Sequence, residues 1–290
     1  MENTPPLTLD ERLAQLKRPF WIGYPRAQSI LQQMEDVFQH PKMHRMPNLA
    51  VIGETNNGKT MLLKTFYRRH QPDEANFLAK PTLPILMLQS PPEPDEGRLY
   101  ADILAKLFSK AGTREPAESM LQRIRLLLSN LDTRMIILDE FQHTLAGTGR
   151  RLRRFLNSIK YLGNELQIPI IVAGTPETLN VLQSDPQVAN RFEPRFLPKW
   201  SLDEDYLRLL ATIEPKLGLA NASQLHVPKI ATRLYDESEG TIGELMKLLH
   251  KLSEKAIRTG SERISEDMVS HEQIQAIGWH APSVRNRYVR

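Results

Sequence analysis

The sequence predicts an α/β fold, in which helices sandwich a parallel sheet and a smaller helical domain follows. Short apolar runs with the length of buried strands alternate with segments of helical period, which is the pattern of a parallel sheet with helical crossovers. Beyond Leu202 the strand pattern stops and helical segments continue. We therefore expect an N-terminal arm (1–20), an α/β domain (21–200), a helical domain (201–277) and a basic tail (278–290).

The expected elements can be placed in chain order. Apolar runs predict buried strands at 49–52, 84–89, 135–140 and 168–175, and a strand-like piece lies within 189–196. Apolar residues at intervals of three and four predict helices at 30–38, 97–111, 116–130, 149–162, 202–217, 227–238, 242–258 and 265–277. A short amphipathic piece, Leu9–Lys17, precedes them and has Thr8 as its N-cap candidate.

The composition is that of an ordinary globular protein. The chain has 290 residues, of which 40% are hydrophobic and 25% charged, and its formal net charge is +4. The lack of cysteine excludes disulfides and thiolate chemistry. No apolar run approaches the roughly 20 residues of a membrane span, and the first residues do not resemble a signal peptide. We expect a cytoplasmic protein with no membrane partner, and the modest positive charge permits a polyanionic one.

The first strand runs directly into a phosphate-binding loop. Residues 53–60 match G-x-x-x-x-G-K-[ST] at every fixed position, and the alternative is a glycine-containing turn that binds nothing. The apolar strand before the motif and the amphipathic helix after it favour the loop, with Lys59 on the β- and γ-phosphates of ATP and Thr60 on Mg²⁺. The expected nucleotide contacts are Gly53, Glu54, Thr55, Asn56, Asn57, Gly58, Lys59, Thr60 and Met61.

Two adjacent carboxylates end the strand at 135–140. Asp139 and Glu140 would lie at the carboxyl edge of the sheet, where ligands bind in open parallel sheets. Such a pair is also common at a helix start, but downstream of a phosphate loop it predicts a Walker B motif. Asp139 would then hold Mg²⁺, and Glu140 would orient and polarise the water that attacks the γ-phosphate.

Three further sites are functional candidates, and two of them have two interpretations each. Thr175 ends the strand at 168–175 and is either a γ-phosphate sensor or a strand-terminating cap. The arginines before the helical domain, Arg191 and Arg195, have no obvious acidic partner except Glu193. The dense Trp21–Arg26 stretch is either a packed loop or the wall of a base pocket, which would be lined by Ile22, Gly23 and Tyr24.

The helix at 149–162 has one basic face. Its cations are Arg150, Arg153, Arg154 and Lys160, with Asn157 and no acid between them. Such a face is either solvated or bound to the phosphate backbone of double-stranded DNA. If this helix does not bind DNA, Lys110 and Arg114 are alternative contacts.

Taken in order, these motifs resemble the AAA+ ATPases, and within them the TniB/TnsC/MuB group of transposition regulators. The closer resemblance is carried by Trp21–Arg26, Gly53–Thr60, Ile137–Gln142, Arg154–Lys160 and Gln187–Phe192. It implies an ATP-dependent, Mg²⁺-dependent protein that assembles as rings or filaments on target DNA, recruits or activates a transposase, and is dismantled by hydrolysis.

The resemblance also implies a role for the two arginines and shows one departure. Arg191 or Arg195 would be the finger that completes the site of a neighbouring subunit. Many AAA+ helical domains carry an arginine in a Gly-x-x-Arg motif, but here Gly240–Gly243 is followed by Glu244, and Lys247 is a weak substitute. The alternative function is an AAA+ remodelling or signalling ATPase that acts on protein partners without DNA.

Overall fold

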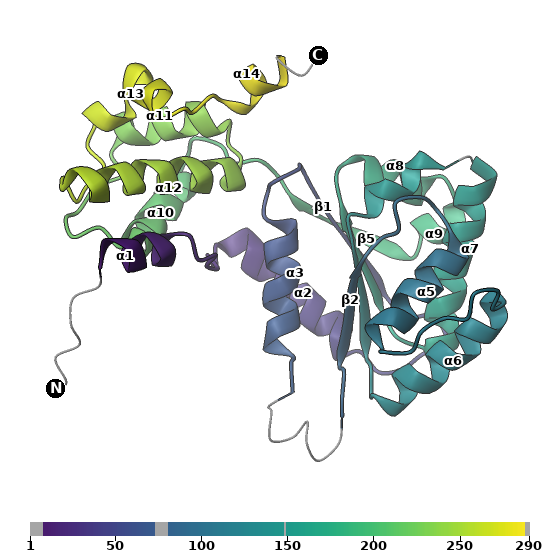
Figure 1. Cartoon of the computed structure of the whole chain (residues 1–290). Coiled ribbons are helices and arrows are strands. Elements are labelled where there is room, and N and C mark those ends of the chain that lie inside the picture. Colours follow the sequence, from purple (N-terminus) through teal and green to yellow (C-terminus); the bar gives the residue numbers. More distant parts are fainter. Residues whose placement is uncertain (1–7, 73–80, 148, 288–290) are drawn as a thin grey trace. The chain divides into compact units, whose positions relative to one another are not determined.

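The computed structural model describes residues 8–72, 81–147 and 149–287, with side chains up to Arg285. The chain divides into two compact units (Figure 1). The α/β unit contains residues 25–55 and 59–197. The helical unit contains the residues up to Tyr24, the short segment 56–58, and the chain from Pro198 onward.

A five-stranded parallel sheet forms the centre of the α/β unit, as the alternating pattern predicts. Its strands lie in the order β2-β3-β4-β1-β5, so β1 lies in the interior beside β4 and β5. Their bounds are β1 (Asn48–Gly53), β2 (Ile85–Gln89), β3 (Met135–Asp139), β4 (Ile170–Gly174) and β5 (Phe192–Leu197). Every residue of β1, β3 and β4 is buried, whereas the edge strand β5 is half exposed and tolerates Pro194.

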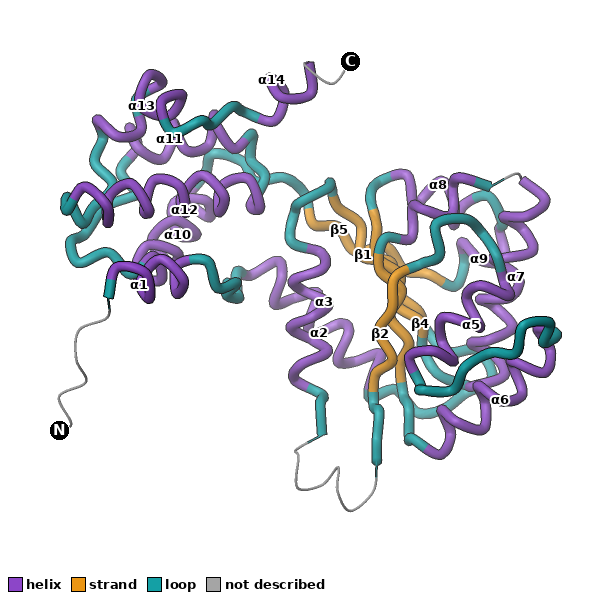
Figure 2. The backbone as a smooth tube through the Cα atoms, in the orientation of Figure 1, coloured by secondary structure: helices purple, strands orange, loops and turns teal. Residues whose placement is uncertain are grey.

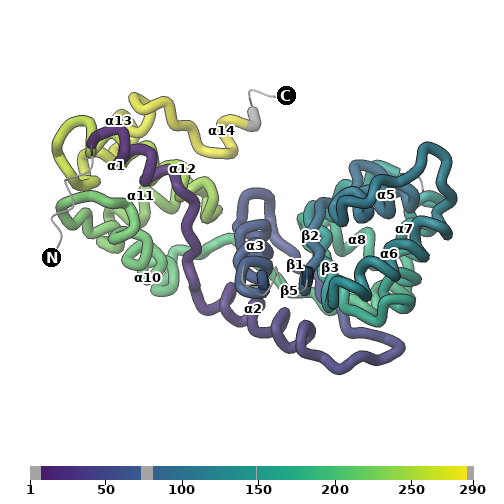
Figure 3. The backbone as a smooth tube through the Cα atoms, turned by 60° about the horizontal axis from the view of Figure 1, so that its bottom comes forward, coloured from purple at the N-terminus to yellow at the C-terminus, as the bar shows by residue number. Residues whose placement is uncertain are grey.

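Helices cover both faces of this sheet (Figures 2 and 3). One face is covered by α2 (Pro25–Phe38) and α3 (Lys59–Arg69). The helices of the other side are α5 (Glu96–Lys106), α6 (Ala117–Asn130), α7 (Gly149–Leu166), α8 (Glu177–Gln183) and α9 (Pro186–Ala189). Their apolar faces form one core with the strands, which includes Tyr100, Ile124 and Phe155. This packing holds the carboxyl ends of the strands rigidly at one edge.

The helical unit has its own apolar core, which includes Tyr206, Leu234 and Leu249. Its main helices are α10 (Glu204–Ile213), α11 (Pro228–Ser238) and α12 (Ile242–Thr259), and a 3₁₀ turn, η2 (Glu214–Leu217), extends α10. The helix expected at 265–277 is broken into η3 (Asp267–Val269) and α13 (His271–Ala276), and α14 (Pro282–Arg287) follows. Tyr288 and Arg290 of the expected basic tail lie outside the described residues.

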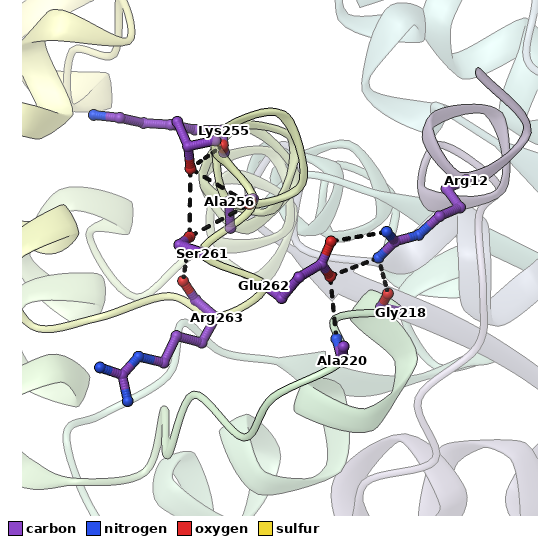
Figure 4. Close-up of polar contacts among 9 residues, drawn as sticks. Arg12, Gly218, Ala220, Lys255, Ala256, Ser261, Glu262 and Arg263 are labelled. Carbon is purple, nitrogen blue, oxygen red and sulfur yellow. Dashed lines mark hydrogen bonds and ion pairs between the residues drawn. The ribbon is translucent and has the colours of Figure 1, made fainter. Parts of the chain in front are cut away.

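The first helix, α1 (Leu9–Leu16), is a member of the helical unit. Thr8 caps it with a capping box, and Leu13 and Leu16 enter the apolar core of the unit. Arg12 donates two bonds to Glu262, at 2.8 and 2.7 Å, and one to the carbonyl of Gly218 (Figure 4). Burial of one helix face together with this fork-shaped ion pair anchors α1.

No helix in the described ranges is long and apolar enough to cross a membrane.

Candidate nucleotide site

The phosphate-loop sequence follows β1 and leads into α3. Gly53 ends the strand where a Cβ atom would lie 2.7 Å from the backbone oxygen of Leu197, so a side chain would force β1 and β5 apart. Asn56 and Gly58 have positive φ angles of 62° and 88°, and left-handed residues occur in the backbone nests that bind anions. Glu54, Thr55 and Asn56 are exposed. The loop therefore has the backbone form that binds phosphate.

Lys59 begins α3 and is 5% exposed. Its Nζ donates to the carbonyls of Gly53 and Glu54, both at 2.8 Å. Burial lowers the pKa of Lys59, while the carboxylates of Glu140 and Asp139 act in the opposite direction. The ammonium group is thus held inside the loop by two neutral acceptors, which a phosphate can replace.

Thr60 and Asp139 meet although they come from different elements. Thr60 Oγ1 donates to Asp139 Oδ2 at 2.7 Å, and the other carboxylate oxygen accepts the backbone N–H of Glu140 at 2.9 Å. Asp139 is 2% exposed, so its charge is stabilised by these few groups. A cavity of about 710 Å³ opens beside both side chains. A hydroxyl and one carboxylate beside open space fit Mg²⁺, which takes oxygen ligands and keeps positions for water and phosphate.

Glu140 has a left-handed backbone, with φ 55° and ψ 41°, and precedes the 3₁₀ turn η1 (Phe141–Ala146). A non-glycine residue in this region is strained, and such strain clusters at active sites. Gln142 Nε2 donates to Glu140 Oε2, and Gln142 Oε1 accepts the N–H of Thr175 at 3.2 Å. Gln142 therefore ties Glu140 to the end of β4. The sequence alone indicated no role for Gln142, because its partners Glu140 and Thr175 follow two different strands, β3 and β4.

Thr175 lies directly after β4 and is half-buried. Its hydroxyl bonds Glu177 and lowers the pKa of that carboxyl group. A Cβ atom on Gly174 would lie 2.6 Å from Gln142 Oε1, so glycine leaves room for the close approach of Gln142. The structure places Thr175 beside the Glu140–Gln142 pair, and its sensor role stays a prediction.

The two arginines before the helical unit differ in their partners. Arg195 forms an ion pair with Glu193 and donates to the carbonyl of Pro194 at 3.1 Å. Arg191 is half-buried and donates to a neutral group, Asn164 Oδ1, at 2.8 Å. Burial lowers the pKa of Arg191, and the neighbouring cation Arg45 adds to this effect. The charge of Arg191 is therefore less compensated than that of Arg195.

The predicted DNA-contacting cations are distributed over two surfaces. Arg150, Arg153 and Arg154 are exposed on α7, and none of them pairs with an acid in the part of the chain that the structure describes. Lys160 is half-buried and donates to Gln187 at 2.8 Å, so it lies apart from the freely exposed group. Lys110 and Arg114 are exposed in the loop between α5 and α6.

The residues expected around the base lie in the helical unit. Ile22 is 7% exposed within its apolar core, and the ring of Tyr24 lies edge-on to Trp200, with 4.8 Å between ring centroids. Burial raises the pKa of Tyr24 to about 12. The neighbouring Gly23 belongs to the same segment. This packing explains the density of apolar groups in the stretch, and contact with a base remains a prediction.

The same unit contains the departure from the Gly-x-x-Arg motif. Glu244 accepts from Lys247 at 2.8 Å and from Asn56 at 2.7 Å, and it pairs with Arg285. Burial opposes ionisation, but these partners together lower the pKa of Glu244. Lys247 is thus engaged by an acid of its own helix, which makes it a poor substitute for a phosphate-binding arginine.

Comparisons with known proteins identify a family and a fold. The sequence model of the bacterial TniB protein family matches residues 12–202. No curated protein matches the sequence significantly.

Solved structures similar to this chain include two ORC proteins and one replication initiation protein. The Aeropyrum pernix ORC2 protein in ADPNP–ADP complexes has a TM-score of 0.65 and 17% identity, over 91% of this chain and 71% of that chain. The Aeropyrum pernix ORC1 protein in complex with DNA has a TM-score of 0.61 and 16% identity, over 91% of this chain and 68% of that chain. Domain III of DnaA from Thermotoga maritima has a TM-score of 0.54 and 16% identity, over 94% of this chain and 97% of that chain. At these identities the likeness shows the fold, which is that of the AAA+ P-loop ATPases.

Proposed function

Because the chain belongs to the bacterial TniB family, we propose that it is an ATP-dependent regulator of transposition that assembles on double-stranded DNA and recruits or activates a transposase. The observation that carries the proposal is the contact of Thr60 with Asp139, next to Glu140, which is the arrangement expected of an AAA+ hydrolytic site. ATP would hold subunits together on DNA, and its hydrolysis would release them.

In this proposal different residues of the α/β unit bind the phosphates of ATP, hold Mg²⁺ and activate the attacking water. Lys59 leaves the carbonyls of Gly53 and Glu54 to bind the β- and γ-phosphates, and the loop N–H groups bind the remaining oxygens. Thr60 and Asp139 would hold Mg²⁺, which neutralises charge that develops on the phosphates. Glu140 accepts a proton from the attacking water and orients it.

Gln142 controls the position of that base. Its amide holds the Glu140 carboxylate and the backbone of Thr175 at once, so the water-orienting group and the end of β4 move together. The hydrogen bond from Gln142 also occupies Oε2 of Glu140, so this oxygen is less available to solvent water. Thr175 would report the state of the γ-phosphate through this connection.

Two features support DNA as the partner. The arginines of α7 are exposed and unpaired within the described ranges, which suits a phosphate backbone. The ORC1 protein of the same fold was solved in complex with DNA. A protein that acted on protein partners alone would not need a cluster of three uncompensated arginines.

Assembly into rings or filaments would require a residue that acts on a neighbouring subunit. We assign this role to Arg191 rather than Arg195, because Asn164 leaves the charge of Arg191 uncompensated while Glu193 neutralises that of Arg195. Arginine fingers supplied in trans are worth about 10³–10⁵ in rate in other NTPases.

The experiment is a salt series of duplex binding with the double variant Arg150→Ala and Arg153→Ala. We expect weaker binding to all sequences and a salt slope lowered by roughly one per lost phosphate contact, with ATP binding unchanged. The matched control is Arg208→Ala with Arg258→Ala, which removes two exposed arginines that are paired with acids of their own helices. If both double variants bind duplex alike, α7 is a solvated face and this part of the proposal is wrong.

A further inference from the structure

The loop between α5 and α6 displays a phenylalanine in an unusual way. Phe108 is 101% exposed, and its φ angle is 54°. It occupies the position that closes the carboxyl end of α5, with Phe108 N–H donating to Ala105 O at 3.1 Å and Ser109 N–H to Leu104 O at 2.9 Å. This bond pair is the Schellman motif, in which the left-handed residue is usually glycine. The loop lies at the periphery of the α/β unit (Figures 2 and 3).

Neither local geometry nor packing explains phenylalanine at this position. A left-handed backbone is costly for a residue with a Cβ atom, and glycine would close the helix without that cost. A large aromatic ring in full contact with water also forgoes the stabilisation that burial would provide. Since glycine would serve the fold better, the ring is a candidate for a contact outside the folded chain.

The loop around the ring is braced. On either side of Phe108, Leu107 and Ala111 pack against the core of the α/β unit. Arg123 donates to the carbonyl of Lys110 at 3.1 Å and to Glu115 Oε2 at 3.0 Å. The ring is therefore presented from a fixed base, which lowers the entropy cost of its use in binding.

The segment that carries Phe108 is rich in cations. Lys110 and Arg114 are exposed, and neither has an acidic partner among the described residues. The segment 103–114 contains no Asp or Glu. At its two ends, Asp102 is paired with Arg98, and Glu115 with Arg123. The segment around Phe108 is thus positively charged and carries one fully exposed apolar side chain.

We propose that Phe108 is a wedge that inserts its ring at a base step of double-stranded DNA, with Lys110 and Arg114 on the flanking phosphates. Cations bind the phosphate backbone at any sequence, and an apolar side chain between base pairs unstacks and kinks the duplex. The proposal rests on the proposed DNA-binding function and adds the surface and the mode of contact. A kinked duplex would also mark a site for a partner that recognises bent DNA.

The decisive variant is Phe108→Gly. A wedge predicts weaker duplex binding without loss of stability, whereas a structural role for the ring predicts a lower melting temperature. Glycine relieves the backbone strain, so the melting temperature should stay the same or rise. Duplex affinity should fall about 5-fold to 150-fold, the range expected for a stacking contact. The fluorescence rise of a 2-aminopurine base in the bound duplex, which reports unstacking, should disappear, and Phe108→Leu should retain part of it.

Two further variants separate the wedge from general binding. Lys110→Ala with Arg114→Ala should lower the salt slope by roughly two, while Phe108→Gly leaves the slope unchanged, since the ring releases no counterions. Leu126→Ala is the matched control, because it removes another exposed apolar side chain, 62% exposed on α6, and should change neither affinity nor fluorescence.

The outcomes distinguish the wedge from the proposed function. If the full chain binds no duplex in any nucleotide state, both are wrong. If Phe108→Gly binds duplex like the unaltered chain with the same fluorescence, the wedge is wrong and the DNA-binding function stands. If that variant keeps duplex binding and loses a protein partner, the ring fits a protein pocket, and the wedge is wrong again. A lowered melting temperature would show that Phe108 is structural.

Discussion

Replacement of Lys59 by alanine should remove the thermal stabilisation that ATP confers on the α/β unit. In the unaltered chain, ATP at about one hundred times its dissociation constant stabilises the folded state by about 2.7 kcal/mol. For a domain of this size, that corresponds to a rise of about 5–10 °C in melting temperature.

The loss can be estimated from the two bonds that Lys59 makes. Its ammonium donates to two carbonyls in the loop and would make the same number of bonds to phosphate oxygens. A hydrogen bond to a charged group contributes about 1.5–3 kcal/mol, so removal of two should weaken ATP binding by roughly 150-fold or more. At the same ATP concentration the expected rise falls to about 1 °C.

The assay is thermal unfolding followed by circular dichroism, with and without ATP and Mg²⁺. Without ATP we expect little change, because the lost bonds are offset by removal of a buried charge. Arg69→Ala is the matched control, since it removes one exposed cation from the other end of α3. If ATP raises the melting temperature of Lys59→Ala as much as that of the control, the loop does not bind phosphate as described.

Three further predictions concern turnover, subunit contact and pH. Glu140→Gln should bind ATP but hydrolyse it about 10²–10⁴ times more slowly, because an amide cannot accept the proton of water; unchanged steady-state phosphate release would exclude Glu140 as the base. Arg191→Ala and Lys59→Ala should each lack ATP turnover, and a mixture of the two variants should regain part of it. In mixed assemblies some interfaces pair the intact nucleotide pocket of the Arg191→Ala chain with the intact arginine of the Lys59→Ala chain. If mixed assemblies form without any recovery of turnover, Arg191 does not act in trans. Glu262→Gln should destabilise the helical unit by about 1–2 kcal/mol at neutral pH. The hydrogen bond from Arg12 lowers the pKa of Glu262. The stabilisation by this ion pair is therefore present above the pKa that Glu262 has in the unfolded chain, and it is lost as the pH falls through the pKa in the folded chain. A stability difference between the variant and the unaltered chain that is equal at acidic and neutral pH would contradict this prediction.

The sheet and the site beside it could be predicted because their signals are local. Each buried strand is a short apolar run, and parallel strands end at one edge, so Lys59, Thr60, Asp139 and Glu140 were expected to converge. The fifth strand was visible only as a strand-like piece, because the edge strand β5 is half exposed and contains Pro194.

The remaining features depend on contacts that sequence spacing does not reveal. Helix α1 joins the helical unit through the pair Arg12–Glu262, whose members are far apart in the chain. The role of Gln142 follows from its place between Glu140 and the end of β4. The helix expected at 97–111 ends as α5 at Lys106, so Phe108 lies beyond the helix and is exposed.

Electron microscopy of the full chain with duplex DNA tests the central claim, ATP-dependent assembly on DNA, most directly. With a non-hydrolysable ATP analogue and Mg²⁺, the account predicts ordered rings or filaments on the duplex, which are lost with ADP and do not form with Lys59→Ala. Free, unassembled chains beside bare duplex, under conditions in which the analogue demonstrably occupies the site, would contradict it.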